Sequence, residues 1–179
     1  MRRFAVLALA LVLLAGACKK KNELAANINA ANKVSNRVAR LYYESGEMLL
    51  TAESRNIALP ESPAAAIPVV ARELMKGPAA KTSLRLFPAD TIVRGAYLLP
   101  GGNVIVDLGG PTLQKGWETG SHTELMAIHS LVQTVTANFA EARRVRVLVN
   151  GSPAETLAGH ISLSRPFAPD TNYVEQRSR

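Results

Sequence analysis

The spacing of apolar residues alternates along the chain between a helical period and a strand period. Apolar positions three and four residues apart run from Pro63 to about Leu74 and again from Thr123 to Phe139. Ser62 is a typical N-cap residue before the first of these segments, and proline is tolerated in a first helical turn. The pattern therefore predicts two amphipathic helices, of which the second is the longer.

Shorter segments, rich in β-branched and aromatic residues that alternate with polar ones, predict strands. They cover residues 38–43, 48–51, 92–99, 104–108 and 145–149, with a last short strand around 161–163. The resulting order, β-β-α-β-β-α-β, indicates an α+β fold. We expect a mixed or antiparallel sheet with two helices packed on one of its faces.

Turn-forming residues separate these elements. Glycine followed by proline ends a helix, a glycine-rich tract joins two strands, and Asn-Gly is characteristic of a type I′ turn. The predicted structural turn residues are Gly77, Pro78, Gly101, Gly102, Asn150 and Gly151.

The N-terminal pattern is that of an export signal. Two arginines, an apolar run from Phe4 to Leu14 and several small residues precede Cys18, and Lys19 to Lys21 follow it. This arrangement is typical of a secretory signal peptide, and the cysteine at its end resembles the lipid acceptor of a bacterial lipoprotein. The apolar run is shorter than the ~20 residues of a membrane-spanning helix. We therefore expect acylation of Cys18, with an uncleaved anchor and ordinary secretion as the alternatives.

The predicted organisation is one folded domain behind a membrane attachment. Cys18 is the only cysteine among 179 residues, so no disulfide can form within the chain and packing alone must hold the domain. The Asn-, Ala- and Lys-rich segment after it is typical of a tether. We expect a signal peptide at 1–17, a lipidated N-terminus and flexible tether at 18–37, a folded domain at 38–170 and a loose tail at 171–179.

Positive charge is concentrated at the N-terminus. The net charge is +7, yet residues 1–37 contain seven basic residues against one acidic residue, whereas the remaining chain contains 14 basic and 13 acidic residues. Nucleic-acid-binding domains carry their basic residues on the folded domain itself. We therefore expect neither DNA nor RNA as a partner, and the lysines after Cys18 favour anionic lipid headgroups instead.

A series of segments resembles the GerMN domain in its order and spacing. This domain is named after the spore germination protein GerM and defines a family found in many bacterial lipoproteins and envelope proteins. The matching segments are the opening strand 38–43, the helix that ends at 77–78, the strand 91–99 behind 87–88, the turn and strand 102–108, the helix around 131–134 and the segment 145–151. The resemblance implies a compact α/β domain similar to the ring-building modules of sporulation and secretion assemblies. It implies no catalytic residues.

Residues that carry enzyme chemistry are sparse. His122 and His129 fall on one helical face but two turns apart, about 10 Å along the axis, which is too far for both to bind one zinc ion at ~2.1 Å. His160 lies far from them in the sequence. The chain contains neither a nucleophile elbow nor a phosphate-binding glycine loop. We expect no metal, no cofactor and no catalytic residue.

The loop after the predicted strand 104–108 holds the remaining candidates. Trp117 could anchor a protein partner, or it could cover the small core. Asp107 and Glu118 could form a carboxylate pair if the loop folds back, whereas an aspartate at a strand end commonly caps nearby amides.

These observations favour a noncatalytic envelope lipoprotein, anchored by palmitate or similar acyl chains on Cys18 in the cell membrane or the outer membrane. Its GerMN-like domain is expected to mediate protein-protein assembly, with another envelope protein or with its own copies. The resemblance adds an expected link to sporulation or germination. The alternative is a cell-wall glycan-binding factor or hydrolase that acts through the loop from Asp107 to Trp117.

Overall fold

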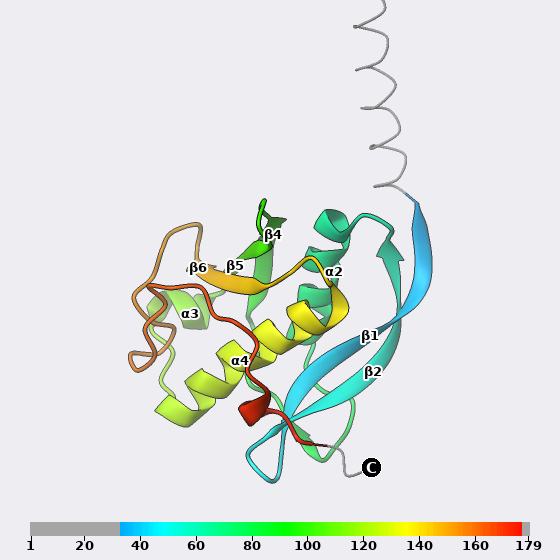
Figure 1. The fold of residues 1–179 in the computed structure, drawn as a ribbon. Coiled ribbons are helices and arrows are strands. Elements are labelled where there is room, and N and C mark those ends of the chain that lie inside the picture. Colours follow the sequence, from blue (N-terminus) through cyan, green and yellow to red (C-terminus); the bar gives the residue numbers. More distant parts are fainter. Residues whose placement is uncertain (1–32, 177–179) are drawn as a thin grey trace, which may run out of the picture.

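The computed structural model describes residues 33–176. Its elements are β1 (Val34–Ser45), β2 (Leu50–Pro60), α2 (Pro63–Met75), β3 (Ser83–Leu84), β4 (Ile92–Leu98), β5 (Asn103–Gly109), α3 (Pro111–Lys115), α4 (Ser121–Asn138) and β6 (Arg144–Val149), followed by a 3-10 turn at Thr171–Tyr173 (Figure 1). The predicted α+β class is confirmed. The predicted signal peptide and Cys18 lie outside the described residues.

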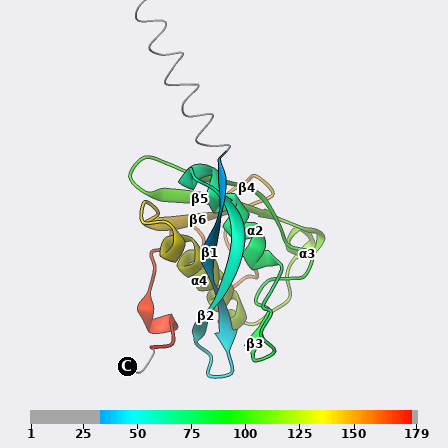
Figure 2. The same ribbon diagram turned by 90° about the vertical axis from the view of Figure 1, so that its right-hand side faces the viewer.

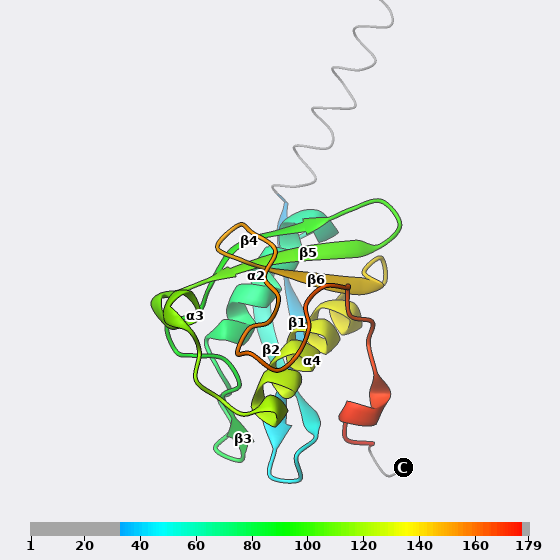
Figure 3. The ribbon, with the colours of Figure 1, turned by 90° about the vertical axis from the view of Figure 1, so that its left-hand side faces the viewer.

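The strands form two sheets, and helices α2 and α4 lie between them. Strands β2, β1 and β3 make an antiparallel sheet, whereas β4, β5 and β6 make a mixed sheet in which β5 and β6 run parallel. Helix α2 contacts β1, β2 and β4, α4 contacts β1 and β6, and the helices contact each other. Figures 1 and 3 show the sheets on opposite sides of the helices, and Figure 2 looks onto the β1–β2 hairpin.

This arrangement differs from the expected single sheet with both helices on one face. The run 126–135 of α4 is buried without interruption, so the helix has neighbours around its whole circumference. We expected both helices on one face of a sheet because each shows one row of apolar residues, and one such row predicts that a single face of the helix is covered. That expectation did not account for the buried polar residues on the other side of α4.

Polar residues on that side of α4, of which Ser130 and Thr134 are buried and Asn138 is half-buried, bond to the backbone along the middle of β1 as a neighbouring strand would. The Asn138 side chain accepts a hydrogen bond from the N–H of Arg40 (2.9 Å) and donates one to its carbonyl (2.7 Å). The Thr134 hydroxyl accepts from the N–H of Tyr42 (3.0 Å), and the Ser130 hydroxyl donates to the Tyr42 carbonyl (2.5 Å). Three side chains spaced four residues apart thus satisfy backbone groups that the edge of β1 would otherwise leave unpaired.

Three expected strands also differ from the structure. The strand expected at 48–51 is β2, which begins at Leu50 and continues to Pro60. Residues 34–37, expected in the tether, belong to β1, because Val34 lies opposite Pro60 in the long hairpin with β2. Residues 161–163, expected as a last strand, are not a strand. The backbone of Phe167 instead exchanges two hydrogen bonds with Val145 of β6, each 2.8 Å long.

The segment from residue 171, expected to be a loose tail, is packed against the domain as far as it is described. The Tyr173 ring stacks on His129 with centroids 4.1 Å apart. The N–H of Glu175 donates a 2.9 Å hydrogen bond to the carbonyl of Leu50. One aromatic contact and one backbone hydrogen bond thus hold this polar segment in place. The sequence did not predict this packing, because the segment shows no hydrophobic periodicity.

The turn residues named above lie where elements end or reverse direction. Gly77 follows α2 with φ of 88°, a left-handed backbone conformation that glycine adopts without the strain that a Cβ would add. Pro78 comes next in the chain. The other four all have positive φ, two in the β4–β5 turn and two after β6: Gly101, Gly102, Asn150 and Gly151.

Replacing Thr134 by valine tests these hydrogen bonds between α4 and β1. The two side chains have nearly the same shape, so the change leaves the buried N–H of Tyr42 without its acceptor, and we expect the free energy of unfolding to fall by about 1–3 kcal/mol in urea denaturation. Thr136→Val is the matched control, because that hydroxyl bonds within α4 to the carbonyl of Val132. Equal losses in the two variants would contradict the assigned role.

Candidate functional site

Both carboxylate oxygens of Asp107, in β5, accept hydrogen bonds from other residues. Oδ1 accepts a 2.8 Å hydrogen bond from the N–H of Gly151, and Oδ2 accepts one of 3.1 Å from Nε of Arg94. The carboxylate therefore ties the turn after β6 to the end of β5, as expected of an aspartate that caps nearby amides. Glu118 is exposed in the loop between α3 and α4.

Trp117 covers the core. Its indole is half-buried and stacks on the buried ring of Phe87, with centroids 6.4 Å apart and planes inclined by 23°. Two roles were considered for Trp117, anchoring a partner and covering the core, and its contacts in the structure are those of the second role.

The three histidines lie in separate environments. His122 Nε2 is 2.8 Å from Oε1 of Glu44, and His160 Nδ1 is 3.2 Å from Oε2 of Glu124. His129 is buried beside Tyr173, and this burial lowers its pKa against a smaller opposite effect of a nearby aspartate. In the described part of the chain, no group of three or more His, Cys, Asp or Glu side chains is placed to hold a metal ion.

Glu124, which the sequence did not single out, organises a whole loop. Its side chain is fully buried in α4, where Oε1 accepts hydrogen bonds from the N–H groups of Leu157 and Ala158, and Oε2 from those of His160 and Ile161. Burial alone would raise the pKa of this carboxyl, but the four backbone donors outweigh it and lower the pKa below the ordinary value. The partners lie at least 33 residues away, so no local pattern revealed the role.

A second unpredicted cluster fixes the C-terminal end of α2. The Arg55 guanidinium contacts the carboxylates of Glu53 (2.6 Å) and Glu73 (3.2 Å), donates to the carbonyl of Gly77 (2.6 Å) and lies 5.7 Å from the centre of the Tyr43 ring. The Tyr43 hydroxyl donates to the same carbonyl, and burial raises its pKa to about 12. The cluster thereby satisfies carbonyl groups that a helix end leaves free.

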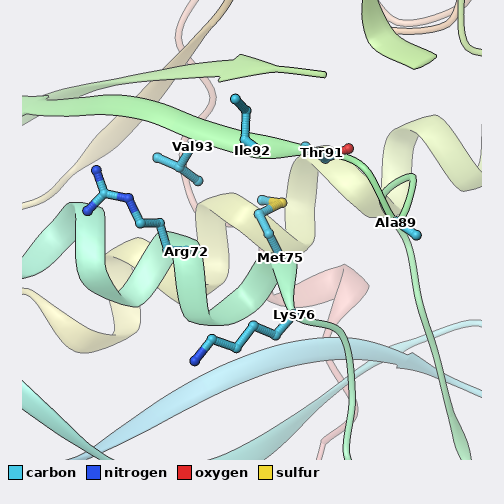
Figure 4. A pocket seen from close by; sticks show the side chains of 7 residues that line it. All are labelled: Arg72, Met75, Lys76, Ala89, Thr91, Ile92 and Val93. Carbon is cyan, nitrogen blue, oxygen red and sulfur yellow. The ribbon is translucent and has the colours of Figure 1, made fainter. Parts of the chain in front are cut away.

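Next to this fixed helix end lies a candidate binding surface. A groove of about 420 Å³ runs between α2 and the beginning of β4, with a floor of buried apolar side chains and basic residues at its rim (Figure 4). Figure 4 shows Arg72 and Met75 rising from α2 toward β4, whereas Lys76 points away from the strand. The lining residues are Arg72, Met75, Lys76, Ala89, Thr91, Ile92 and Val93.

The groove adjoins the outer strand of its sheet. Strand β4 is at the end of the order β4-β5-β6, and in residues 33–176 no strand pairs with its outer edge. Ile92 is 56% exposed, and Tyr97 and Leu99 are exposed as well. The groove and the edge together offer backbone hydrogen-bonding groups and an apolar pocket to an extended segment of another chain.

Between residues 33 and 176, no helix is both long and apolar enough to cross a bilayer.

Glu124→Gln is expected to destabilise the protein by roughly 3 kcal/mol at neutral pH, because the amide NH₂ of glutamine would face backbone donors and leave some of them unpaired. Urea denaturation measures the loss. The stabilisation from the lowered pKa is fully present above the ordinary glutamate value near 4.3 and disappears as the pH falls through the lower folded-state value. The difference in unfolding free energy between wild type and Glu124→Gln should therefore become smaller in acid.

The matched control for this change is Glu118→Gln, because Glu118 is exposed. We expect it to leave the unfolding free energy and its pH dependence nearly unchanged. The assigned role would be contradicted if the difference in unfolding free energy between wild type and Glu124→Gln stayed constant down to pH 2–3, below the ordinary glutamate range.

Comparisons with known proteins agree with the resemblance noted in the sequence. A crystal structure of a candidate lipoprotein from Clostridium perfringens matches with a TM-score of 0.54 and 19% identity, over 79% of this chain and 94% of that one. The first GerMN domain of the sporulation protein GerM from Bacillus subtilis matches with a TM-score of 0.51 and 18% identity, over 75% of this chain and 96% of that one. Both show the same fold.

The structure of the tandem GerMN domains of the same Bacillus subtilis protein matches with a TM-score of 0.53 and 19% identity, over 76% of this chain and 46% of that one. No curated protein sequence matches this chain at a significant level. The profile of the Germane family, described as sporulation and spore germination, matches residues 40–155, which is more than half of the chain. The chain therefore belongs to the Germane family.

Proposed function

We propose that this protein is a noncatalytic assembly module of the cell envelope that binds an extended segment of another envelope protein along β4 and is held at the membrane by acyl chains on Cys18. The observation that carries the proposal is the outer edge of β4, with which no strand in residues 33–176 pairs, beside an apolar groove. Membership in a family described by sporulation and spore germination is compatible with a role in the envelope.

Strand addition explains how such a surface binds. Backbone hydrogen bonds to the free edge of β4 provide affinity, and alternate side chains of the added strand provide specificity by entering pockets. Met75 and Val93 give the groove an apolar floor, which suits one such apolar side chain. The guanidinium of Arg72 at the rim has no acidic partner in residues 33–176, so an acidic residue in the bound segment would complement it.

The contacts of Asp107 support a noncatalytic role. A hydrolase that used this carboxylate would need it free to reach substrate, whereas here Arg94 and Gly151 occupy its two oxygens. Turnover of peptidoglycan fragments that Asp107→Asn abolishes would establish the glycan hydrolase in place of the assembly module.

Anchoring at Cys18 would keep the binding surface close to the membrane. The chain between Cys18 and Lys33 limits the distance from the acyl chains to the first described residue to about 50 Å. A diacylated cysteine, with two or more chains, gives lasting attachment. The fold shared with a candidate lipoprotein of Clostridium perfringens supports this part of the proposal.

Photocrosslinking tests the partner surface. A photoreactive amino acid that replaces Ile92 in the full-length chain, expressed in native membranes, is expected to give one discrete adduct with an envelope protein, because Ile92 lines the groove and is exposed. The control position is Glu118, exposed on a different loop. Arg72→Glu should reduce the adduct at Ile92 severalfold through charge repulsion. Equal adducts at both positions, or none at Ile92, would argue against the groove as a binding site.

Metabolic labelling with palmitate tests the anchor. The wild-type chain is expected to incorporate label and to sediment with membranes, and Cys18→Ala is expected to lose both properties because Cys18 is the only cysteine. A wild-type chain that stays unlabelled and fractionates with the cytosol would refute the anchoring.

A further inference from the structure

The first part of β1 is a second sheet edge that no other described strand pairs with. At Arg40 and Tyr42 the strand directs its N–H and C=O groups away from β2, toward side chains of α4. Backbone groups that face one edge of a strand recur at every second residue. The groups of Val34, Asn36 and Val38 therefore face this same edge, and no group in residues 33–176 bonds to them.

This open edge, residues 34–38, carries exposed apolar side chains. Val34 is 55% exposed and Val38 is 67% exposed, and both belong to the same face of the strand. Across the hairpin, Val34 lies opposite Pro60 and Asn36 lies opposite Ala58. An exposed edge with apolar side chains is a template for pairing with another chain.

We infer that two copies of this chain pair through the open edge, antiparallel, with Asn36 of one copy opposite Asn36 of the other. In this register Val34 of each copy faces Val38 of its partner, and each outward-facing pair exchanges both backbone hydrogen bonds. Valine meets valine and no like charges stand directly opposite each other. The guanidinium of Arg37 is held on its own hairpin by the Pro60 carbonyl at 2.5 Å, which keeps it off the shared edge.

The limits of the open edge favour a second copy over a longer strand from another protein. Asn138 of α4 occupies the edge at Arg40, so a partner strand can pair only with the residues that precede it. Figure 1 shows β1 running on beyond this end of α4. In a symmetric pair each copy contributes the same short segment, and the α4 of each copy lies past the end of the other copy's segment.

The pairing also needs a shared membrane. An edge of this length buries less than the standard interface of about 1,600 Å², so confinement of both copies to one surface must raise their effective concentration. In this respect the inference rests on the proposed anchoring at Cys18. It does not involve the groove at β4.

Cysteine crosslinking of the full-length chain in native membranes tests the register. Directly opposed hydrogen-bonded residues have Cα atoms about 5.5 Å apart, within disulfide range, so Asn36→Cys should form about tenfold more disulfide-linked homodimer than wild type under mild oxidation. Val38→Cys alone is the matched control, because it faces Val34 rather than itself. Coexpressed Val34→Cys and Val38→Cys chains should form the dimer again.

A backbone variant provides the second measurement. Asn36→Pro removes an N–H that points away from β2, so the hairpin keeps its hydrogen bonds, and the melting temperature should change little. The same change should abolish the crosslink between Val34→Cys and Val38→Cys chains. Equal dimer yields for Asn36→Cys and Val38→Cys, absence of the Asn36→Cys dimer, or its adducts with other proteins would each overturn the inference. Palmitate labelling of the same variants shows separately whether the anchoring has failed.

Discussion

Strand β1 depends on backbone hydrogen bonds supplied by a helix, and the rest of the fold is arranged around that requirement. A buried N–H or C=O without a partner costs about 1–3 kcal/mol. Within residues 33–176, β1 has β2 as its only neighbouring strand for most of its length, because β3 pairs with its last two residues alone. Ser130, Thr134 and Asn138 meet the need from α4. This holds α4 against β1 on one side while its apolar residues reach the other sheet.

The charged groups of the interior serve the same purpose as these hydroxyls and amides. Glu124 accepts hydrogen bonds from backbone N–H groups of a loop, and Asp107 accepts one from a turn. Arg55 donates one to a carbonyl at the end of α2. Each replaces the hydration that a loop or helix end loses when it is buried. Because these side chains are occupied in this way, the features of the described domain that remain for recognition are its edges and grooves.

Two such edges lie on different elements and differ in character. The edge of β4 borders a groove whose fixed wall is the end of α2, which suits a strand with a specific side chain to insert. The edge at the start of β1 is short, flanked by α4 and lined by valines, which suits its own copy. Under the two proposals made above, the domain would bind a partner at the edge of β4 while it pairs with its own copy at the start of β1.

Local pattern in the sequence determined the α+β class, the two long helices, the turns with positive φ and the inward placement of Val145 and Val147 in β6. These properties depend on residues within a few positions of one another, where periodicity and turn chemistry are informative. Tertiary structure alone decided the division into two sheets, the pairing of α4 with β1, the role of Glu124 and the contacts of Trp117. The partners concerned are separated by about 30 to almost 100 residues, and a polar residue's own neighbours do not reveal which distant backbone group it will satisfy when both are buried.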